Sequence, residues 1–220
     1  MKIQYPKNYL VFDTETTGLD STKDRIVEIA ALQVFEGKEP VQFQKLIKWK
    51  DSIGDKCTEI TGITQAEVDE KGEDPNIVFK EFYELMAPQG IRPLPLIGHN
   101  IIKFDIPFLL ATGMFSSWDG FMIDRYIWNH SVDTAALFKA KKLQQEWMWY
   151  EDFMHYGVRA LDTRVQGLKF NVGVCCDELG ISREGIKQHR ALADVMLTNE
   201  IYKKLCEIDT QVPATAAANA

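Results

Sequence analysis

The chain has 220 residues, 45% of them hydrophobic and 26% charged, with a net charge of −7. This composition indicates a soluble globular protein, long enough for one domain with a large core and short for two. No apolar run approaches the roughly 18–20 residues of a membrane span, and the N-terminus lacks a signal-peptide pattern. Four cysteines without C-x-x-C spacing predict reduced thiols in a cytoplasmic protein, without a zinc site or a disulfide framework. The negative charge disfavours binding of nucleic acid by bulk electrostatics alone, unless metal ions neutralise the acids at the site.

The first part of the chain predicts three strands in quick succession. An apolar run leads into VFDTETTGLD at 11–20, a β-rich run covers 26–37, and a third covers 40–49. Such short connections are typical of an antiparallel meander. In the first strand Asp13 and Glu15 point to the same side, roughly 6–7 Å apart along the chain. Two carboxylates placed in this way repel each other, so either the strand ends there in solvent or a bound cation lies beside them.

Helices and short strands alternate after the meander. Thr64 begins TQAE, a capping-box pattern that predicts a helix start. The remaining patterns predict a helix over about 75–87, a short strand at 94–100, a helix at 104–113, a short strand at 131–133 and a mainly helical last third. This order predicts an α/β fold of the ribonuclease H-like type, in which a mixed sheet carries a three-strand antiparallel meander, then parallel strands, and helices on its faces.

One folded domain is expected over 1–208, with a polar, disordered tail at 209–220. A helical insertion is expected around 139–168, where 139–156 lacks proline and glycine and is predicted to be helical through most of its length. In such a helix the aromatic residues would form two stripes, one of which contains Trp149. Either both stripes are buried, or the Trp149 stripe stays partly exposed and meets a nucleic-acid base, a partner or a second copy of the chain in a homodimer.

Two further acids and one histidine stand near predicted helix starts. Asp105 follows a predicted strand, where a helix cap or first-turn acid would be sufficient explanation. Asp194 lies beside the apolar stripe of the last predicted helix. His189 precedes Asp194 by five residues, so the two would face directions about 140° apart if both were inside the helix. His189 can therefore act with Asp194 only from the loop or first turn that leads into the helix.

Taken together, three segments resemble the three exonuclease motifs of the DEDDh, or DnaQ-like, family. They are DTETTG near the N-terminus, N-x-x-x-F-D in the middle and H-x-A-L-x-D near the C-terminus. EITGIT at 59–64 also resembles the segment that this family carries between its first two motifs. The resemblance covers roughly residues 8–206. Asn100 and Asp105 are five positions apart, a spacing that leans slightly toward the three-prime repair exonuclease type.

The resemblance implies a catalytic site with two divalent ions and a histidine base. Its ligands would be four carboxylates: Asp13, Glu15, Asp105 and Asp194. Hard oxygen ligands suit Mg²⁺ or Mn²⁺, and two such ions can stabilise the attacking and leaving oxygens of a phosphoryl displacement. The resemblance implies that His189 is the general base, since a histidine with an ordinary pKa near 6.5 can accept a proton at neutral pH.

Three more residues match positions with substrate roles in the family. The resemblance implies that Thr16 and Leu19 contact the terminal nucleotide, with Leu19 against the base, although Leu19 could equally be a turn residue tucked onto the core. Asn100 matches the motif-two asparagine, for which a structural hydrogen bond and a substrate contact are both open. Asp133 resembles a further family segment and is interpreted as a helix-start acid, not a ligand.

The sequence as a whole therefore predicts a metal-dependent exonuclease. The resemblance implies 3′–5′ polarity and release of nucleoside 5′-monophosphates. DNA is the expected partner, with an RNA-directed exoribonuclease as the alternative, because the sequence locates no contact to the 2′-hydroxyl. A non-catalytic module that binds nucleic acid or a polymerase is the third interpretation. Such a module would not need all four acids and the histidine.

Overall fold

The computed structural model describes residues 4–88, 92–112, 120–184 and 190–211. Within this part of the chain five strands form one sheet in the order β3-β2-β1-β4-β5. β1 pairs with β2 and β2 with β3 in antiparallel fashion, whereas β1 pairs with β4 and β4 with β5 in parallel. The strands are β1 (Tyr9–Thr16), β2 (Ile26–Val34), β3 (Val41–Leu46), β4 (Leu96–Gly98) and β5 (Val132–Asp133). The predicted α/β fold, with its meander followed by parallel strands, is confirmed.

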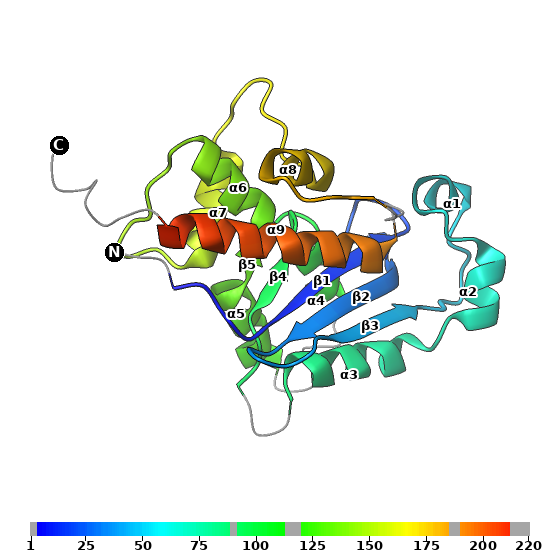
Figure 1. Ribbon diagram of the computed structural model, residues 1–220. Coiled ribbons are helices and arrows are strands. Elements are labelled where there is room, and N and C mark those ends of the chain that lie inside the picture. The colour runs from blue at the N-terminus through cyan, green and yellow to red at the C-terminus, as the bar shows by residue number, and fades with distance from the viewer. Residues whose placement is uncertain (1–3, 89–91, 113–119, 185–189, 212–220) are drawn as a thin grey trace, which may run out of the picture.

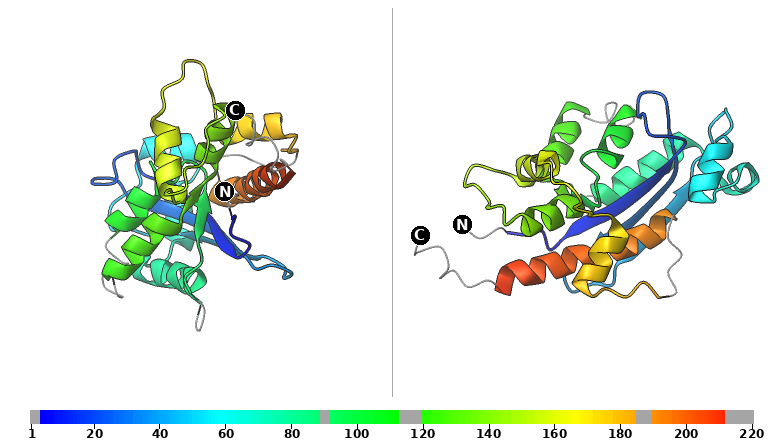
Figure 2. Two further views of the ribbon diagram at one scale, coloured as in Figure 1. Left: turned by 90° about the vertical axis from the view of Figure 1, so that its left-hand side faces the viewer. Right: turned by 90° about the horizontal axis from the view of Figure 1, so that it is seen from above.

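Helices cover both faces of this sheet, as Figures 1 and 2 show. α9 lies across one face against β1 and β2, while α3 and α4 lie on the other face (Figure 1). The helices of the described residues are α1 (Asp55–Thr61), α2 (Gln65–Lys71), α3 (Pro75–Met86), α4 (Asp105–Ala111), α5 (Gly120–His130), α6 (Thr134–Lys142), α7 (Phe153–Asp162), α8 (Val172–Leu179) and α9 (Ala191–Gln211). The fold is therefore a three-layer sandwich of helices around a mixed sheet.

The alternation of side chains along β1 decides which residues reach which layer. The Tyr9 hydroxyl donates to Asn199 of α9 at 3.0 Å, so the odd-numbered residues of β1 face α9. Phe12 packs against Phe82 of α3 with ring centroids 5.7 Å apart, so the even-numbered residues face the opposite layer. Asp13 must then lie under α9, on the same side as Tyr9.

The capping pattern at Thr64 is confirmed, because the Thr64 hydroxyl accepts the backbone N–H of Glu67 at 3.1 Å at the start of α2. The helix expected over 75–87 corresponds to α3, and the strands expected near 94–100 and 131–133 correspond to β4 and β5. Gly113, where one predicted helix was expected to end, lies outside the described residues.

The continuous helix predicted over 139–156 is wrong. α6 ends at Lys142 and α7 begins at Phe153, and the segment between them is not helical. Gln144 adopts a φ of 51°, a left-handed backbone conformation that stops α6. Asp152 starts the next helix, since its side chain accepts the backbone N–H of His155 at 2.8 Å. The two aromatic stripes predicted for a single helix therefore do not exist.

The last helix continues past the expected domain end at Ile208 and reaches Gln211. Asp209 explains the extension, because its carboxylate accepts a hydrogen bond from the Tyr5 hydroxyl and forms an ion pair with Lys141. Residues 209–211 are thus helical, and Asp209 contacts the N-terminal segment and α6, in contrast to the disordered tail predicted there. Residues 212–220 lie outside the described part of the chain.

Candidate active site

Three carboxylates meet where the central strand ends. Asp13 and Glu15 project from the α9-facing side of β1, and Asp194 comes from the first turn of α9. One oxygen from each of these residues lies within 4.8 Å of the others, close enough for a single cation to bind all three. Both β1 acids are only partly buried, so the cluster remains open on one side. These residues form the acidic cluster, and hard oxygen donors of this kind suit a divalent metal ion.

Asp105 reaches the same end of β1 from the β4 side. It is the first residue of α4 and is 2% exposed. Its Oδ1 accepts hydrogen bonds from the Thr14 backbone N–H at 3.0 Å and from the Thr14 hydroxyl at 2.6 Å. β4 ends at Gly98, so the backbone N–H of Thr14 in β1 donates to the Asp105 carboxylate and not to a carbonyl of a neighbouring strand. Asp105 therefore lies next to the three clustered acids without belonging to the group within 4.8 Å.

The electrostatics of these acids favour a cation. Burial raises the pKa of Asp13 well above its usual range, and the negative charges of Asp105, Asp194 and Glu15 raise it further. Burial also raises the pKa of Glu15 to about 7, and the charges of Glu28 and Asp194 contribute. For Asp105, burial raises the pKa to about 7 against the hydrogen bonds from Thr14. The raised pKa values partly reflect repulsion between these carboxylates. A divalent ion would remove most of this repulsion, so the donor set fits a metal.

We expect metal-free wild-type protein to lose stability relative to Glu15→Gln as pH rises from about 5 to 7. The pKa of Glu15 is 4.5 without structure and about 7 in the fold, so the folded state keeps a proton that the unfolded state has released. This stabilisation is fully present below the unfolded pKa and is lost as pH rises through the folded pKa. Thermal unfolding of both proteins in chelator measures the difference, and Mg²⁺ should restore the wild-type midpoint at pH 8. A wild-type midpoint that rises relative to Glu15→Gln would contradict the expectation.

The turn after β1 carries two of the predicted substrate residues. Thr16 is buried, and its hydroxyl donates to the Gly18 carbonyl at 2.5 Å. The absence of a side chain at Gly18 leaves room for the Asp24 carboxylate, with which a Cβ at this position would collide. Leu19 is 83% exposed, so the interpretation of Leu19 as a residue tucked onto the core is wrong. Its contact with a terminal nucleotide remains a prediction, and so does that of Thr16.

Asn100 lies in a tight loop between β4 and α4. Its φ of 64° is left-handed, and its backbone N–H donates to Asp133 Oδ1 at 3.0 Å. Asp133 also accepts the N–H of Ile102 and caps α6 through the N–H of Ala136, so its predicted role as a helix-start acid is confirmed. The Asn100 side chain lines a cleft beside the acidic cluster. The structural hydrogen bond is thus made by the backbone of Asn100, and substrate contact by its side chain stays a prediction.

His189, the predicted base, lies outside the described residues. Arg190, the next residue, leads directly into α9. The role of His189 as general base stays a prediction.

A cleft of about 970 Å³ opens beside the acidic cluster. Its lining includes Asp13, Asn100 and Asp194 together with the segment 168–174 and Arg183. The imidazole of His99, which also lines the cleft, fixes the segment at Phe170, because it contacts Thr134 through Nδ1 at 2.9 Å and the Phe170 carbonyl through Nε2 at 2.7 Å. The volume of the cleft lies at the upper end of the range of about 300–1,000 Å³ that is typical of small-molecule pockets.

Two basic residues of this cleft were not identified from the sequence. Lys169 lines the cleft and is exposed. Arg183 lies over the first turn of α8, where Gly173 leaves room: a Cβ at Gly173 would be 3.2 Å from Arg183 Nη1. Arg183 also pairs with Asp177 at 2.6 Å. No local motif marks these residues, because loop and helix bring them to the cleft only in the folded chain.

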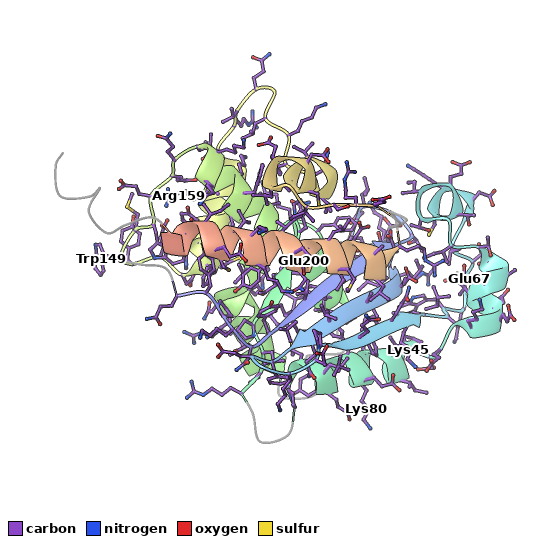
Figure 3. The ribbon with its side chains drawn as sticks, viewed as in Figure 1. Lys45, Glu67, Lys80, Trp149, Arg159 and Glu200 are labelled. Carbon is purple, nitrogen blue, oxygen red and sulfur yellow. The ribbon has the colours of Figure 1, made fainter. Side chains whose placement is uncertain are left out.

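Trp149 lies far from the acidic cluster, at the opposite end of the molecule (Figure 3). It is 81% exposed, so the interpretation in which both aromatic stripes are buried is wrong for this residue. Its neighbour Trp147 packs against Phe153, which contacts Tyr5 beside the C-terminal end of α9. Asp194 stands near the other end of that helix, about 22 Å away at 1.5 Å per residue.

The sheet order and the carboxylates at its centre define a nuclease of the ribonuclease H-like class. The family comparison agrees, and its model for the exonuclease family RNase_T matches residues 10–202. The chain belongs to this exonuclease family, and the resemblance to the DEDDh, DnaQ-like exonucleases is confirmed. The lean toward the three-prime repair type stays a prediction.

Among curated proteins the chain is similar to PolC-type DNA polymerases III. It is 29% identical to that of Clostridium perfringens over 201 residues, which is 90% of this chain and 11% of the relative. It is 27% identical to that of Thermotoga maritima over 210 residues, which is 94% of this chain and 12% of the relative. The chain therefore spans only about a tenth of the length of these curated relatives.

Solved structures share the fold. E. coli exonuclease I in complex with a dT13 oligonucleotide superposes with a TM-score of 0.64 at 21% identity, covering 93% of this chain and 42% of that one. Exonuclease I from Methylocaldum szegediense gives a TM-score of 0.67 at 18% identity, covering 94% and 42%. Among the described residues, no helix has the length and apolar character that crossing a membrane requires.

Proposed function

We propose that this chain is a metal-dependent 3′–5′ exonuclease that hydrolyses phosphodiester bonds of DNA and releases nucleoside 5′-monophosphates. One observation carries the proposal: the convergence of Asp13, Glu15 and Asp194 within 4.8 Å at the mouth of a large cleft. A protein that only binds nucleic acid gains nothing from such mutual repulsion. The proposal treats the chain up to the end of α9 at Gln211 as one exonuclease domain, with 139–168 as its insertion, in a cytoplasmic protein.

Two Mg²⁺ or Mn²⁺ ions are the proposed cofactors, held by the acidic cluster together with Asp105. When bound, such ions stabilise the attacking and leaving oxygens of an in-line displacement. The chain itself contributes the placement of the ligands. Thr14 fixes the Asp105 carboxylate through two hydrogen bonds, and β1 fixes the spacing of Asp13 and Glu15. His189 is the proposed base that accepts the proton of the attacking water.

Similar proteins support DNA as the substrate. The curated relatives are named as DNA polymerases, and the solved neighbours include E. coli exonuclease I with a dT13 or a dA16 oligonucleotide. A cleft whose lining includes Lys169 and Arg183 suits a phosphate backbone. The proposed substrate is therefore single-stranded DNA or the 3′ end of a duplex.

The decisive experiment uses end-labelled DNA and RNA, single- and double-stranded, with and without Mg²⁺. A label at the 5′ end should yield a ladder of shortened products on DNA, and a label at the 3′ end should appear at once as a mononucleotide. Immediate release of a labelled mononucleotide from the substrate labelled at its 5′ end would contradict the 3′–5′ polarity. Faster degradation of RNA than of DNA would establish the exoribonuclease alternative. Absence of degradation on all substrates, with metal bound, would leave a binding module.

We expect Lys169→Ala to weaken binding of single-stranded DNA by a similar factor for every sequence. A lysine that contacts phosphate contributes through counterion release, so its loss should reduce the slope of log affinity against log salt by about one. Fluorescence anisotropy of a labelled oligonucleotide over several salt concentrations measures both quantities. Lys80→Ala is the matched control, since Lys80 is an exposed lysine of α3 on the far side of the sheet (Figure 3). Equal slopes for both variants would exclude Lys169 from the binding surface.

We expect Trp149→Ala to change the free energy of unfolding by less than about 0.5 kcal/mol, because the side chain is exposed. Turnover per folded molecule should stay unchanged, since Trp149 lies at the far end of α9. Denaturant titration and a nuclease assay measure the two effects. Sedimentation velocity of both proteins completes the test. Loss of self-association would assign Trp149 to a homodimer contact, and reduced turnover would show that it reaches the nucleic acid.

A further inference from the structure

A fifth carboxylate lies beside the acidic cluster and is not explained by it. Glu28 of β2 stands directly opposite Glu15 in the β1–β2 pair, so both side chains face α9. Glu28 is fully buried, at 0% exposure, in the middle of an apolar strand. A buried carboxylate is costly unless its oxygens accept hydrogen bonds. The first question is therefore whether Glu28 is offered to a metal or to protein donors.

Protein donors occupy both oxygens of Glu28. Oε1 accepts Arg190 Nη2 at 3.0 Å and Gln44 Nε2 at 2.9 Å, and Oε2 accepts the backbone N–H of Ala191 at 3.1 Å. Ala191 is the first residue of α9, where a backbone N–H has no acceptor within the helix. A carboxylate at this position also matches the positive end of the helix dipole. Glu28 thus fixes the start of α9 and is not a spare ligand.

Arg190 extends this contact to a third element. Its guanidinium reaches Glu67 of α2 at 3.3 Å in addition to Glu28, and so joins β2, α2 and the start of α9. The backbone carbonyl of Arg190 accepts the N–H of Asp194 at 3.3 Å. Asp194 therefore belongs to the helical turn that begins at the anchored residue. Any movement of that turn moves the Asp194 carboxylate relative to Asp13.

We propose that Glu28 is a positioning residue, which holds the first turn of α9 so that Asp194 completes the metal-binding cluster with Asp13 and Glu15. The inference rests on the proposed function only in taking this cluster as the site of the catalytic metal. Glutamine cannot replace Glu28. The three donors that converge there need an acceptor, and a glutamine amide would direct its own N–H groups at one of them.

The test is a metal titration of the full chain without substrate. Wild type, Glu28→Gln and Ile29→Val are titrated with MnCl₂, and the increase in thermal midpoint gives the apparent affinity. Ile29 is a buried core residue next to Glu28 whose side chain faces the opposite side of the sheet, so it controls for general loss of stability. We expect Glu28→Gln to weaken metal affinity by about 10–100-fold, the usual effect of losing an outer partner of a ligand, and Ile29→Val to leave it nearly unchanged.

If Glu28→Gln does not fold, Glu28→Asp takes its place. It keeps the charge but withdraws the carboxylate from Ala191, so metal affinity should fall in the same direction. Unchanged affinity in the folded variant, or an equal loss in Ile29→Val, would overturn the proposal. Degradation assays at saturating metal separate this outcome from failure of the proposed function. A wild type that binds Mn²⁺ but degrades no nucleic acid refutes the proposed function and leaves the positioning role standing.

Discussion

Asp13→Ala or Asp194→Ala should reduce Mg²⁺-dependent degradation of DNA to background. Each substitution removes one of the three oxygens that lie within 4.8 Å of one another, so the remaining pair no longer surrounds a cation. Without metal the variants should be as stable as wild type at neutral pH, or slightly more so. Each substitution removes one negative charge from a group of acids that repel one another. This repulsion, together with burial, raises the pKa of Asp13 in the wild type. Degradation rates and thermal midpoints in chelator measure both effects.

Asp177→Ala is the matched control for these variants. Asp177 lines the same cleft but pairs with Arg183 and lies outside the acidic cluster. Its loss should leave the dependence of degradation on metal concentration as in wild type. Near-normal turnover of Asp13→Ala at saturating metal would refute the assignment of Asp13 as a ligand, and the same holds for Asp194.

His189→Ala should lower turnover by about 10²–10⁴-fold, the usual range for a general base, and should leave metal binding largely intact. The substitution should also flatten the acidic limb of the pH–rate profile between roughly pH 5 and 7, where an ordinary histidine titrates. Saturating metal is essential here, because Glu15 and Asp105 have pKa values of about 7 in the metal-free protein. Without it, proton competition for the ligands would produce a similar limb.

His155→Ala provides the control, since His155 is an exposed histidine of α7. The α7 start lies near the N-terminal segment, remote from the cleft, so both turnover and the acidic limb should remain as in wild type. An acidic limb that persists unchanged in His189→Ala would assign proton transfer to another group. Loss of Mn²⁺ binding in that variant would instead give His189 a structural part in the metal site.

Local patterns predicted the parts of the fold that depend on neighbours in sequence. Thr64 predicted the start of α2, because a threonine three residues before a glutamate can satisfy the first N–H groups of a helix. Asp13 and Glu15 indicated the position of the site, because two carboxylates on one face of a strand repel each other unless a cation lies beside them. The break between α6 and α7 depends on Gln144, whose backbone adopts a left-handed conformation that is rare for glutamine and that no residue pattern predicts. Asp152 was the one available indication of the break, because an aspartate often caps the start of a helix.

Contacts between distant segments account for most of what the sequence did not reveal. Glu28 lies within IVEIAAL, and an acid in a buried strand should have prompted the search for a partner. That partner, Arg190, is 162 positions away, so no spacing rule connects them. The same holds for Arg183 over Gly173. Asp209 was assigned to the tail because composition cannot show its bonds to Tyr5 and Lys141.

The bond between Tyr5 and Asp209 has a consequence for the architecture of larger proteins. Tyr202 strengthens the same junction by donating to the Pro6 carbonyl at 2.8 Å, so the first and last described segments run side by side. The acidic cluster lies at the other end of α9. These two segments therefore lie together at the end of α9 that is remote from the acidic cluster, an arrangement that tolerates insertion of a domain into a host chain. Lengthening the chain at either segment should therefore leave the acidic cluster unchanged.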